Sequence, residues 1–372
     1  MGVERIAALD SHLVKTYLER AEEVEGALVA LGAKQHMLMI GPPGTAKSAL
    51  IGDLARAVSG VTYFEWQVTK YTTPDELFGP LSLKGLESDS YRRLTAGKAP
   101  EAAVMFLDEV FKANSSILNS LLSLINERKF YNDGQPTASP LVSLFGASNE
   151  LPQGDEETAL AAFADRFLLR YKVDYLAEDG DFAALLRMSQ GQPAPQVTAQ
   201  DLLDYQRASE AVKVPDEVVE AMVQLRRELA HEGITASDRR WRQSLSGLKA
   251  RAALNGAAEV KIDRDFDLLV HVLWQTPDQK KQVAKVVRKT ADPIAERVDE
   301  LVDEAKEVYN AAMTSKETAQ GMEANKKLKE IIKALEGIAP QAALGSQPRV
   351  LKAIETITSY NKEVIKVCLG VQ

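Results

Sequence analysis

The sequence predicts an α/β protein: a mostly parallel β-sheet with helices on both faces, followed by segments that are entirely helical. Short apolar, β-branched or aromatic stretches alternate with stretches of helical periodicity up to residue 173, which is the pattern of a parallel sheet. A stretch with two prolines and a glycine, GQPAPQVT at residues 191–198, then indicates a linker. Beyond it, residues 199–275 show helical periodicity without a clear strand.

Five stretches have the composition of strands, because each is a short run of apolar, β-branched or aromatic residues. They are HMLMIG (36–41), TYFEWQV (62–68), AAVMFLDE (102–109), LVSLFGASNE (141–150) and FLLRYKV (167–173). Helical spacing of apolar residues predicts helices at 11–31, 48–58 and 115–128. Asp133-Gly134, within FYNDGQPTAS, is a hairpin-turn signal.

The C-terminal segment predicts a small helical bundle. Asp292-Pro293 is typical of an N-cap followed by proline at the first helical position, and Ser315 and Pro348 are the expected starts of two further helices. A coiled-coil arm is the alternative, but the apolar run is too short and too broken for a long coiled coil. The expected domains are residues 1–190, 191–276 and 277–372.

The composition is that of an ordinary globular protein, with 45% hydrophobic and 26% charged residues. The single cysteine, Cys368, excludes an intrachain disulfide framework, and the four histidines lack metal-ligand spacing. No apolar run has membrane-spanning length, so we expect a cytoplasmic protein without a membrane span. The net charge of −8 argues against broad nonspecific binding of nucleic acid.

The stretch GPPGTAKS, residues 41–48, follows a predicted strand and precedes a predicted helix, which is the context of a phosphate-binding loop. In such a loop, backbone N–H groups hold phosphate oxygens at a helix N-terminus. Gly41 and Gly44 allow the tight backbone. Lys47 reaches the outer phosphates, and the Ser48 hydroxyl is a ligand for Mg²⁺.

Ala46 stands where the usual phosphate-loop pattern has glycine. We expect its β-carbon to be tolerated provided that its backbone φ is negative, as at the start of a helix. The substitution then weakens the match to the pattern more than it weakens the site. The alternative is a glycine-proline turn followed by a chance Lys-Ser pair.

Asp108 and Glu109 end the apolar stretch VMFLDE. In phosphoryl-transfer enzymes an aspartate at a strand end holds Mg²⁺, and a neighbouring residue positions or polarises the attacking water. Alone, the acidic pair is also compatible with an ordinary strand-to-loop junction. Its position after a phosphate loop and an intervening β-α-β stretch favours the catalytic interpretation.

Two further positions have chemistry suited to the same reaction. Asn149, at the end of a predicted strand, is suited to orient water or contact the γ-phosphate, although loop asparagines more commonly form Asx turns. Arg166, in FADRFLLR, is a candidate arginine finger, and a surface ion pair with Asp165 is the alternative. Arg128, in LINERKF, is a second candidate finger.

The stretch SDRRWRQSL, residues 237–245, collects three arginines at a helix start. Arg239, Arg240 or Arg242 is positioned to reach the γ-phosphate from the helical segment. By spacing alone, a solvated basic face is an equally good interpretation.

Together, five stretches resemble the MoxR-type AAA+ ATPases, and in particular the RavA-like branch, whose members also have alanine before the lysine. They are GPPGTAKS, FLDEVFKANSSILNSLLSLINERKF, GASNELPQ, ADRFLLR and SDRRWRQSL. The resemblance covers residues from about 10 to 275. It implies an AAA+ P-loop nucleotide domain with a parallel five-stranded sheet, then an all-α lid. The helical C-terminal extension differs from the RavA relatives, which have a β-rich insertion there, so their partner-binding role is not carried over.

The resemblance also implies roles for individual residues. The expected catalytic set is Lys47 (Walker A), Asp108 and Glu109 (Walker B), Asn149 (sensor 1), Arg166 (arginine finger) and Arg239 (sensor 2, with Arg240 left open). The expected Mg²⁺ ligands are Ser48 and Asp108. The expected nucleotide-binding residues are Gly41, Gly44, Thr45, Ala46, Lys47, Ser48, Ala49 and, from the helix that borders the adenine at 17–24, Val24. Residues 71–98 resemble the helix-2 insert, and 127–140 the pre-sensor-1 hairpin, both expected to contact clients.

Family members hydrolyse ATP with Mg²⁺ at the subunit interfaces of a ring, usually a hexamer. The resemblance therefore implies a chaperone-like ATPase that remodels, loads or assembles a partner protein, such as one with a von Willebrand A domain. A nucleic-acid-associated AAA+ motor is the first alternative, because the insert and hairpin occur in related DNA motors, but the acidic net charge opposes it. A nucleotide-gated scaffold with little turnover is the second.

Overall fold

The computed structural model describes residues 2–151, 157–188, 194–315, 317–341 and 347–368. The chain divides into two compact units. The first consists of Met1–Val219, Ile234–Val260 and Leu268–Lys280, and the second of Glu220–Gly233, Lys261–Asp267 and Lys281–Gln372. Among the described residues, no helix is both long enough and apolar enough to cross a membrane.

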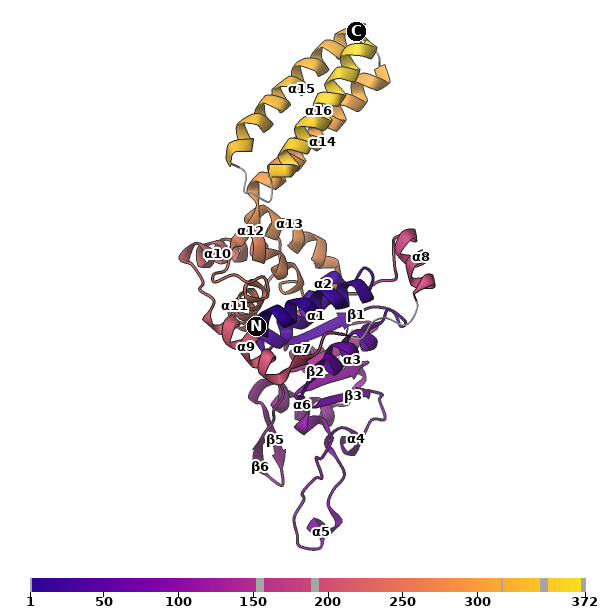
Figure 1. The fold of residues 1–372 in the computed structure, drawn as a ribbon, viewed down its shortest axis with the longest axis vertical. Helices are drawn as coiled ribbons and strands as arrows, with labels where there is room; N and C mark the ends of the chain where they lie inside the picture. Colours follow the sequence, from indigo (N-terminus) through magenta and orange to yellow (C-terminus); the bar gives the residue numbers. More distant parts are fainter. Residues whose placement is uncertain (1, 152–156, 189–193, 316, 342–346, 369–372) are drawn as a thin grey trace. The chain divides into compact units, whose positions relative to one another are not determined.

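The first unit is built on a five-stranded sheet in the order β3-β4-β7-β1-β8, and every neighbouring pair is parallel (Figure 1). The strands are β1 (His36–Ile40), β3 (Tyr63–Gln67), β4 (Val104–Asp108), β7 (Ser143–Ser148) and β8 (Phe167–Lys172). The central strands are buried almost throughout, as continuous apolar runs in a parallel sheet require. All five predicted strands and the five-stranded parallel sheet are confirmed.

Among its described residues, the first unit also contains eight longer helices. They are α1 (Gly2–Thr16), α2 (Ala21–Ala33), α3 (Lys47–Ala57), α6 (Ser115–Glu127), α7 (Glu157–Ala164), α8 (Asp179–Arg187), α9 (Ala199–Ala211) and α11 (Asp238–Leu254). Short elements are β2 (Val58–Ser59), β9 (Val197–Thr198), α4 (Pro74–Phe78), α5 (Leu83–Leu86), η1 (Ala99–Glu101), η2 (Val110–Lys112) and η4 (Pro277–Gln279). β9 pairs with β2, so the end of the predicted linker is a short strand; residues 189–193 of this region lie outside the described residues.

The prediction of a single helix at residues 11–31 is wrong. The chain breaks between α1 and α2, at residues 17–20. Glu19 has a left-handed backbone, with φ of 54°, and the side chain of Arg20 turns to a distant carbonyl group. Apolar periodicity continues through this break because both helices bury their apolar faces, and periodicity alone does not report a local reversal of φ.

The insert at residues 71–98 and the predicted hairpin are joined by hydrogen bonds. The hairpin consists of β5 (Lys129–Asn132) and β6 (Gln135–Ala138), and its turn residue Asp133 accepts hydrogen bonds from the Ser90 hydroxyl (2.7 Å) and the Tyr91 N–H (2.9 Å). The neighbouring Asn132 side chain accepts from the Arg93 N–H and donates to the Arg93 carbonyl group. The two segments, drawn at the same end of this unit in Figure 1, therefore hold each other.

The second unit contains α12 (Ile262–Asp265), α13 (Lys280–Ala291), α14 (Pro293–Ser315), α15 (Thr318–Ile338), η5 (Ala339–Gln341) and α16 (Gln347–Cys368). The chain also has α10 (Asp216–His231) and η3 (Phe266–His271). Helices α14, α15 and α16 pack on one another around an apolar core that includes Leu301, Leu328 and Ile357, so the predicted bundle is confirmed. The prediction that Ser315 caps α15 is wrong. Ser315 ends α14, and Glu317 takes the cap position of α15.

Candidate nucleotide site

The candidate site lies at the carboxyl ends of neighbouring parallel strands. The Gly41 N–H donates to the Ser148 carbonyl group (3.0 Å), and the Val173 N–H donates to the Ile40 carbonyl group (2.8 Å). These bonds tie the start of the phosphate loop to the ends of β7 and β8. Asp108 ends β4, next to β7. The carboxyl edge of the sheet thus brings together residues that are far apart in sequence.

The two glycines of the loop answer different requirements. A β-carbon at Gly41 would lie 1.8 Å from the Val173 carbonyl oxygen, so only glycine fits there. Gly44 has φ of 80° and nothing within 4 Å of the position of a β-carbon, so its requirement is conformational.

Ala46 is also left-handed, with φ of 63° and ψ of 18°. The expectation of a negative φ at this position is therefore wrong. Ala46 is the N-cap position of α3, and the cap residue lies outside the helix, so it is not bound to helical angles. The β-carbon of Ala46 is exposed, which leaves the backbone strain as its cost.

Lys47 begins α3, and only 8% of its surface is exposed. Its ammonium group donates to the carbonyl oxygens of Gly41 and Pro42, each at 2.8 Å. Burial lowers the pKa of Lys47, and the negative charges of Asp108 and Glu109 oppose that shift. The lysine and both acids therefore share one electrostatic environment at the mouth of the loop. Ser48 and Ala49 are exposed in the first turn of α3.

The acidic pair is held in a defined geometry. Asp108 accepts a hydrogen bond from the Glu109 N–H (3.0 Å), and Glu109 has a left-handed backbone with φ of 52°. The Glu109 carboxylate lies 3.4 Å from the Lys112 ammonium group, and its side chain is 13% exposed. Glu109 is therefore turned away from the direction of the strand, with a cation beside it.

A cavity of about 500 Å³ opens beside the loop. Gly44, Thr45 and Ala46 line one side, and the other lining residues are Thr16, Tyr17, Leu18, Arg20, Tyr175, Leu176, Phe182 and Leu185. Val24, predicted to border the base, does not line it: Val24 is fully buried in α2, and the residues just before α2 take that place. The sequence analysis missed the wall at 175–185, for which Phe182 and Leu185 at helical spacing were a signal.

Asn149 is exposed and directly follows β7, so it lies beside the phosphate loop that Ser148 contacts. Arg166 and Arg239 do not line the cavity. Burial lowers the pKa of Arg166, and the charge of Arg239 lowers it further, so the two arginines lie close enough to interact electrostatically. The Arg166 Nε has no hydrogen-bond partner among the described residues.

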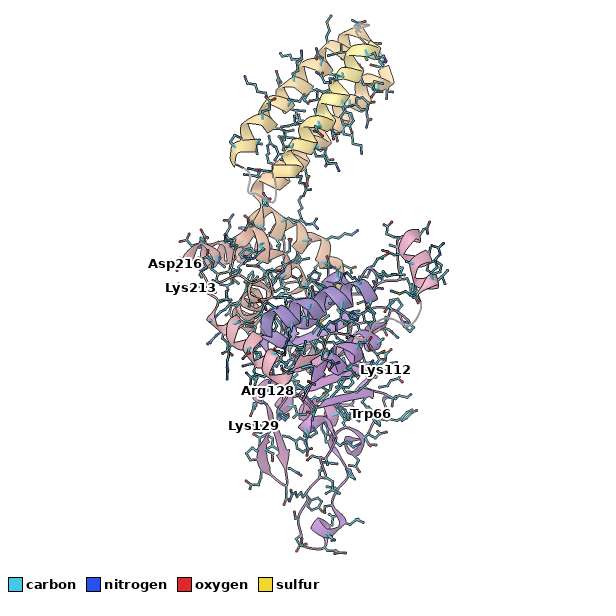
Figure 2. All side chains as sticks on the ribbon, in the orientation of Figure 1. Trp66, Lys112, Arg128, Lys129, Lys213 and Asp216 are labelled. Atoms are coloured by element: carbon cyan, nitrogen blue, oxygen red, sulfur yellow. The ribbon has the colours of Figure 1, made fainter. Side chains whose placement is uncertain are left out.

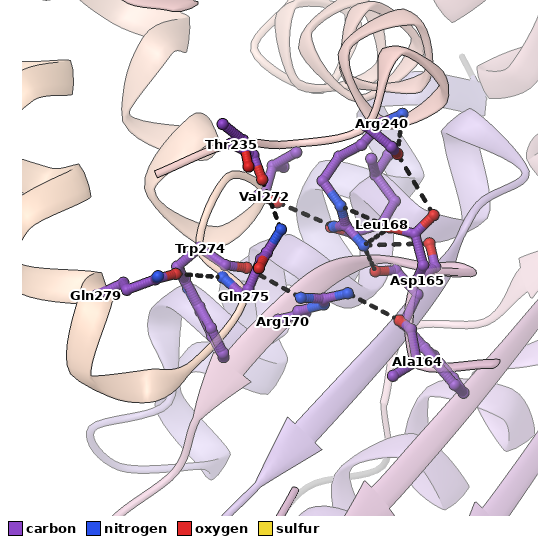
Figure 3. Close-up of polar contacts among 12 residues, drawn as sticks. Ala164, Asp165, Leu168, Arg170, Thr235, Arg240, Val272, Trp274, Gln275 and Gln279 are labelled. Atoms are coloured by element: carbon purple, nitrogen blue, oxygen red, sulfur yellow. Dashed lines mark hydrogen bonds and ion pairs between the residues drawn. The ribbon is translucent and has the colours of Figure 1, made fainter. Parts of the chain in front are cut away.

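Arg240 has a structural position instead. Only 2% of its surface is exposed, and its guanidinium group donates to the carbonyl oxygens of Leu168 and Val272, each at 2.9 Å, and pairs with Asp165 at 3.2 Å (Figure 3). Arg170, in the same cluster, donates to the carbonyl oxygens of Trp274 and Ala164. Burial lowers the pKa of Arg170 to about 9. Arg239 and Arg242 are exposed.

Arg128 is also engaged in the fold. Its guanidinium group donates to the carbonyl oxygens of Ile125, Lys34 and Val142 at 2.8–3.1 Å. Figure 2 shows it next to Lys129, where α6 ends and the β5–β6 hairpin begins. Burial lowers the pKa of Arg128 to about 10.

A parallel sheet in this strand order, with a phosphate loop after β1, an acidic pair at the end of β4 and a helical lid, defines the AAA+ class of P-loop proteins. Residues 4–207 match the family described as "MoxR domain in the MoxR-vWA-beta-propeller ternary systems", and residues 217–287 match "AAA lid domain". The chain belongs to the MoxR-type AAA+ ATPase family.

Similar proteins agree with this assignment. The uncharacterized protein MJ0812 of Methanocaldococcus jannaschii is 37% identical over 367 residues, which are 94% of this chain and 96% of that protein. Its MJ0079 protein is 39% identical over 310 residues, which cover 83% and 79% of the two chains. Chaperone MoxR1 of Mycobacterium tuberculosis is 28% identical over 168 residues, 44% of this chain and 43% of the chaperone. A solved protein described as a "putative ATPase", from Cytophaga hutchinsonii, has the same fold, with a TM-score of 0.62 at 17% identity over 77% of this chain and 94% of its own.

Proposed function

We propose that this chain binds ATP with Mg²⁺ and hydrolyses it at the subunit interfaces of a ring, in order to remodel, load or assemble a partner protein. The observation that carries the proposal is that Lys47, which directly follows the loop residues that line the cavity, shares one electrostatic environment with Asp108 and Glu109. A structural lysine would not need two carboxylates and a phosphate loop beside it.

The geometry supports a role for each residue of the site. The backbone N–H groups of the loop and the start of α3 hold the phosphates, and Lys47 exchanges the carbonyl oxygens of Gly41 and Pro42 for phosphate oxygens. Glu109 polarises the attacking water, and Asn149, which follows the neighbouring strand β7, orients that water. The apolar wall of the cavity receives the base.

The donor set fits Mg²⁺. This ion prefers oxygen ligands, and proteins supply only one or two of them beside phosphate and water. Ser48 offers an exposed hydroxyl at the start of α3, and Asp108 offers the carboxylate oxygen that the Glu109 N–H does not occupy. Bound there, the ion neutralises charge on the phosphates during transfer.

The position of two arginines supports the proposed ring. Phosphoryl transfer is accelerated by an arginine beside the γ-phosphate, supplied within the subunit or by a neighbour. Arg166 and Arg239 lie together and outside the cavity of their own chain, which fits a contribution to the next subunit's site. A hexamer and the RavA-like branch are the specific forms that we propose.

The partner is a protein. The family description that matches residues 4–207 names systems with a von Willebrand A protein and a β-propeller protein, and one relative is named a chaperone. We propose a von Willebrand A-domain partner, with the insert at 71–98 and the hairpin at 127–140 as client contacts. The exposed side chains of Leu83, Tyr91 and Tyr131 on these segments support that role.

The test is the rate of Mg-ATP hydrolysis per subunit, measured across protein concentrations for the wild type and Arg166→Ala. A shared site predicts a specific rate that rises with concentration and is lost in the variant by about 10³-fold or more. Arg207→Ala, in α9, is the matched control, because Arg207 is an exposed arginine in an i,i+3 ion pair far from the loop in sequence. A flat rate with a normal Arg166→Ala variant would reject the ring.

Glu109→Gln separates hydrolysis from binding. The variant keeps the size of the side chain and removes its charge, so it should bind ATP and not turn it over. A wild-type protein that binds ATP but shows no hydrolysis in any oligomeric state would instead support the nucleotide-gated scaffold.

A further inference from the structure

Helix α8 carries much of the apolar wall of the nucleotide cavity but is weakly held by its own packing. Phe182 and Leu185 both line the cavity, and they lie three residues apart on one face of α8. No residue of this helix is buried. In Figure 1, α8 stands apart from the sheet of its unit. Hydrophobic packing therefore cannot account for the placement of this wall.

The N-terminus of α8 lacks a local cap. Its N-cap residue, Glu178, makes no capping hydrogen bond with its side chain. The first N–H groups of a helix have no partner within the helix, and an uncapped terminus frays. Water or another part of the chain therefore satisfies them.

Glu19, which lies between α1 and α2, supplies that cap. Its carboxylate accepts hydrogen bonds from the Ala177 N–H (2.9 and 3.0 Å to its two oxygens) and from the Glu178 N–H (2.8 Å). These bonds lower the pKa of Glu19, so the group is ionised at neutral pH and also interacts favourably with the helix dipole. The left-handed backbone of Glu19 is the turn that precedes α2.

The next residue secures the same segment. The buried guanidinium group of Arg20 donates to the Asp174 carbonyl oxygen and to the carbonyl oxygen of Glu19 (2.8 Å). Between these two attachments, at 174 and 177–178, lie Tyr175 and Leu176, which line the cavity. Glu19 and Arg20 thus both hydrogen-bond to the segment that leads from β8 into α8.

We infer that Glu19 is a positioning residue for the nucleotide: by capping α8 from a distant part of the sequence, it holds Leu176, Phe182 and Leu185 against the base. The inference rests on the proposed ATP binding. Loss of the cap lets α8 fray and move, which lowers the population of the binding-competent wall and weakens affinity in proportion. The proposed chemical step is assigned to Lys47 and Glu109, whereas the Glu19 carboxylate binds the chain at 177–178.

The experiment uses the full chain as wild type, Glu19→Ala, Glu19→Gln and the control Glu22→Ala. Glu22 is an exposed carboxylate nearby that pairs with His271 and Lys280 and not with α8. We measure the Kd for a fluorescent ATP analogue, hydrogen exchange of residues 177–187, and KM and kcat separately. Glu19→Ala should raise Kd and KM by about tenfold, the equivalent of one lost cap, with kcat within about twofold of wild type.

Glu19→Gln keeps one acceptor oxygen and should fall between Glu19→Ala and wild type, and exchange at 177–187 should be faster in both. Glu22→Ala should bind as wild type does. If wild type binds and Glu19→Ala binds equally well, or if exchange at 177–187 is unchanged in it, the inference is wrong and ATP binding stands. If wild type does not bind the analogue, the proposed function fails, and the inference fails with it.

Discussion

The guanidinium group of Arg240 lies 3.2 Å from the carboxylate of Asp165, and this ion pair joins the first turn of α11 to the residue before Arg166. Arg239, which precedes Arg240 in the sequence, is exposed. It lies close enough to Arg166 for its charge to lower the pKa of Arg166, in addition to the effect of burial. One structural arginine thus joins the helix turn that carries the exposed Arg239 to the segment that carries the half-buried Arg166.

The adjacent residues Arg239 and Arg240 should therefore differ in their effect on stability. Arg240→Ala leaves the carbonyl groups of Leu168 and Val272 and the Asp165 carboxylate without their donor, and should lower the free energy of unfolding by about 3–5 kcal/mol. Arg239→Ala should leave stability within about 0.5 kcal/mol, as exposed substitutions do. Urea unfolding measures both, with exposed Arg242→Ala as the control. Equal losses in Arg239→Ala and Arg240→Ala would contradict this division.

The backbone of Ala46 predicts a stabilising substitution. A left-handed alanine costs about 1–2 kcal/mol, whereas glycine adopts this region freely at an entropic cost of about 0.5–1 kcal/mol. Ala46→Gly should therefore raise the free energy of unfolding by about 0.5–1 kcal/mol. Ala49→Gly, at the third residue of the helix, should lower it by a similar amount, because Ala49 has helical angles. Thermal or urea unfolding of the pair gives the comparison, and destabilisation by both substitutions would show that Ala46 carries no strain.

His36 predicts a specific loss of stability in mild acid. Burial, helped by the charge of Arg128, lowers the pKa of His36 to about 3, from about 6.5 in an unfolded chain. The unfolded chain binds the extra proton, so this contribution to stability is complete above pH 6.5 and is lost as the pH falls toward 3. Between pH 7 and pH 5 the loss from this group should be about 2 kcal/mol.

His36→Gln removes that proton uptake, so the wild-type and variant stability curves should converge as the pH falls. Asp10 acts in the opposite direction, because burial and the charge of Glu25 raise its pKa to about 6, but it is common to both proteins and cancels in the difference. Urea unfolding at pH 7, 6 and 5 gives the difference curve. Parallel curves would mean that the pKa of His36 is the same in the folded and the unfolded protein.

The insert and the hairpin should separate when Asp133 is changed. Asp133 has φ of 53°, so Asp133→Gly removes the carboxylate without straining the turn. The Ser90 hydroxyl and the Tyr91 N–H then lose a charged acceptor, and exchange at the Tyr91 amide should accelerate by about tenfold. Gly134→Ala, at the neighbouring turn position, strains the turn but keeps the carboxylate and serves as the control. Unchanged exchange in Asp133→Gly would show that Asn132 alone holds the two segments.

The sequence by itself determined the parallel sheet, the phosphate loop and the acidic pair. Buried parallel strands are continuous apolar runs, and the glycines, lysine and acids of the site follow β1 and β4 directly, so local spacing reports them. The C-terminal bundle was predictable for the same reason, since its apolar residues recur at helical spacing.

Only the tertiary structure decided which of two adjacent arginines is structural, which residues wall the cavity, and that Glu19 caps a helix 158 residues away. The backbone angle of Ala46 also became visible only there. The cavity wall combines side chains that are far apart in sequence. For Arg240, Glu19 and Ala46, the deciding feature is a main-chain carbonyl or N–H group or a φ angle, and every residue carries the same main-chain groups. Such partners leave no pattern in the side-chain sequence, because folding alone decides which of them meet.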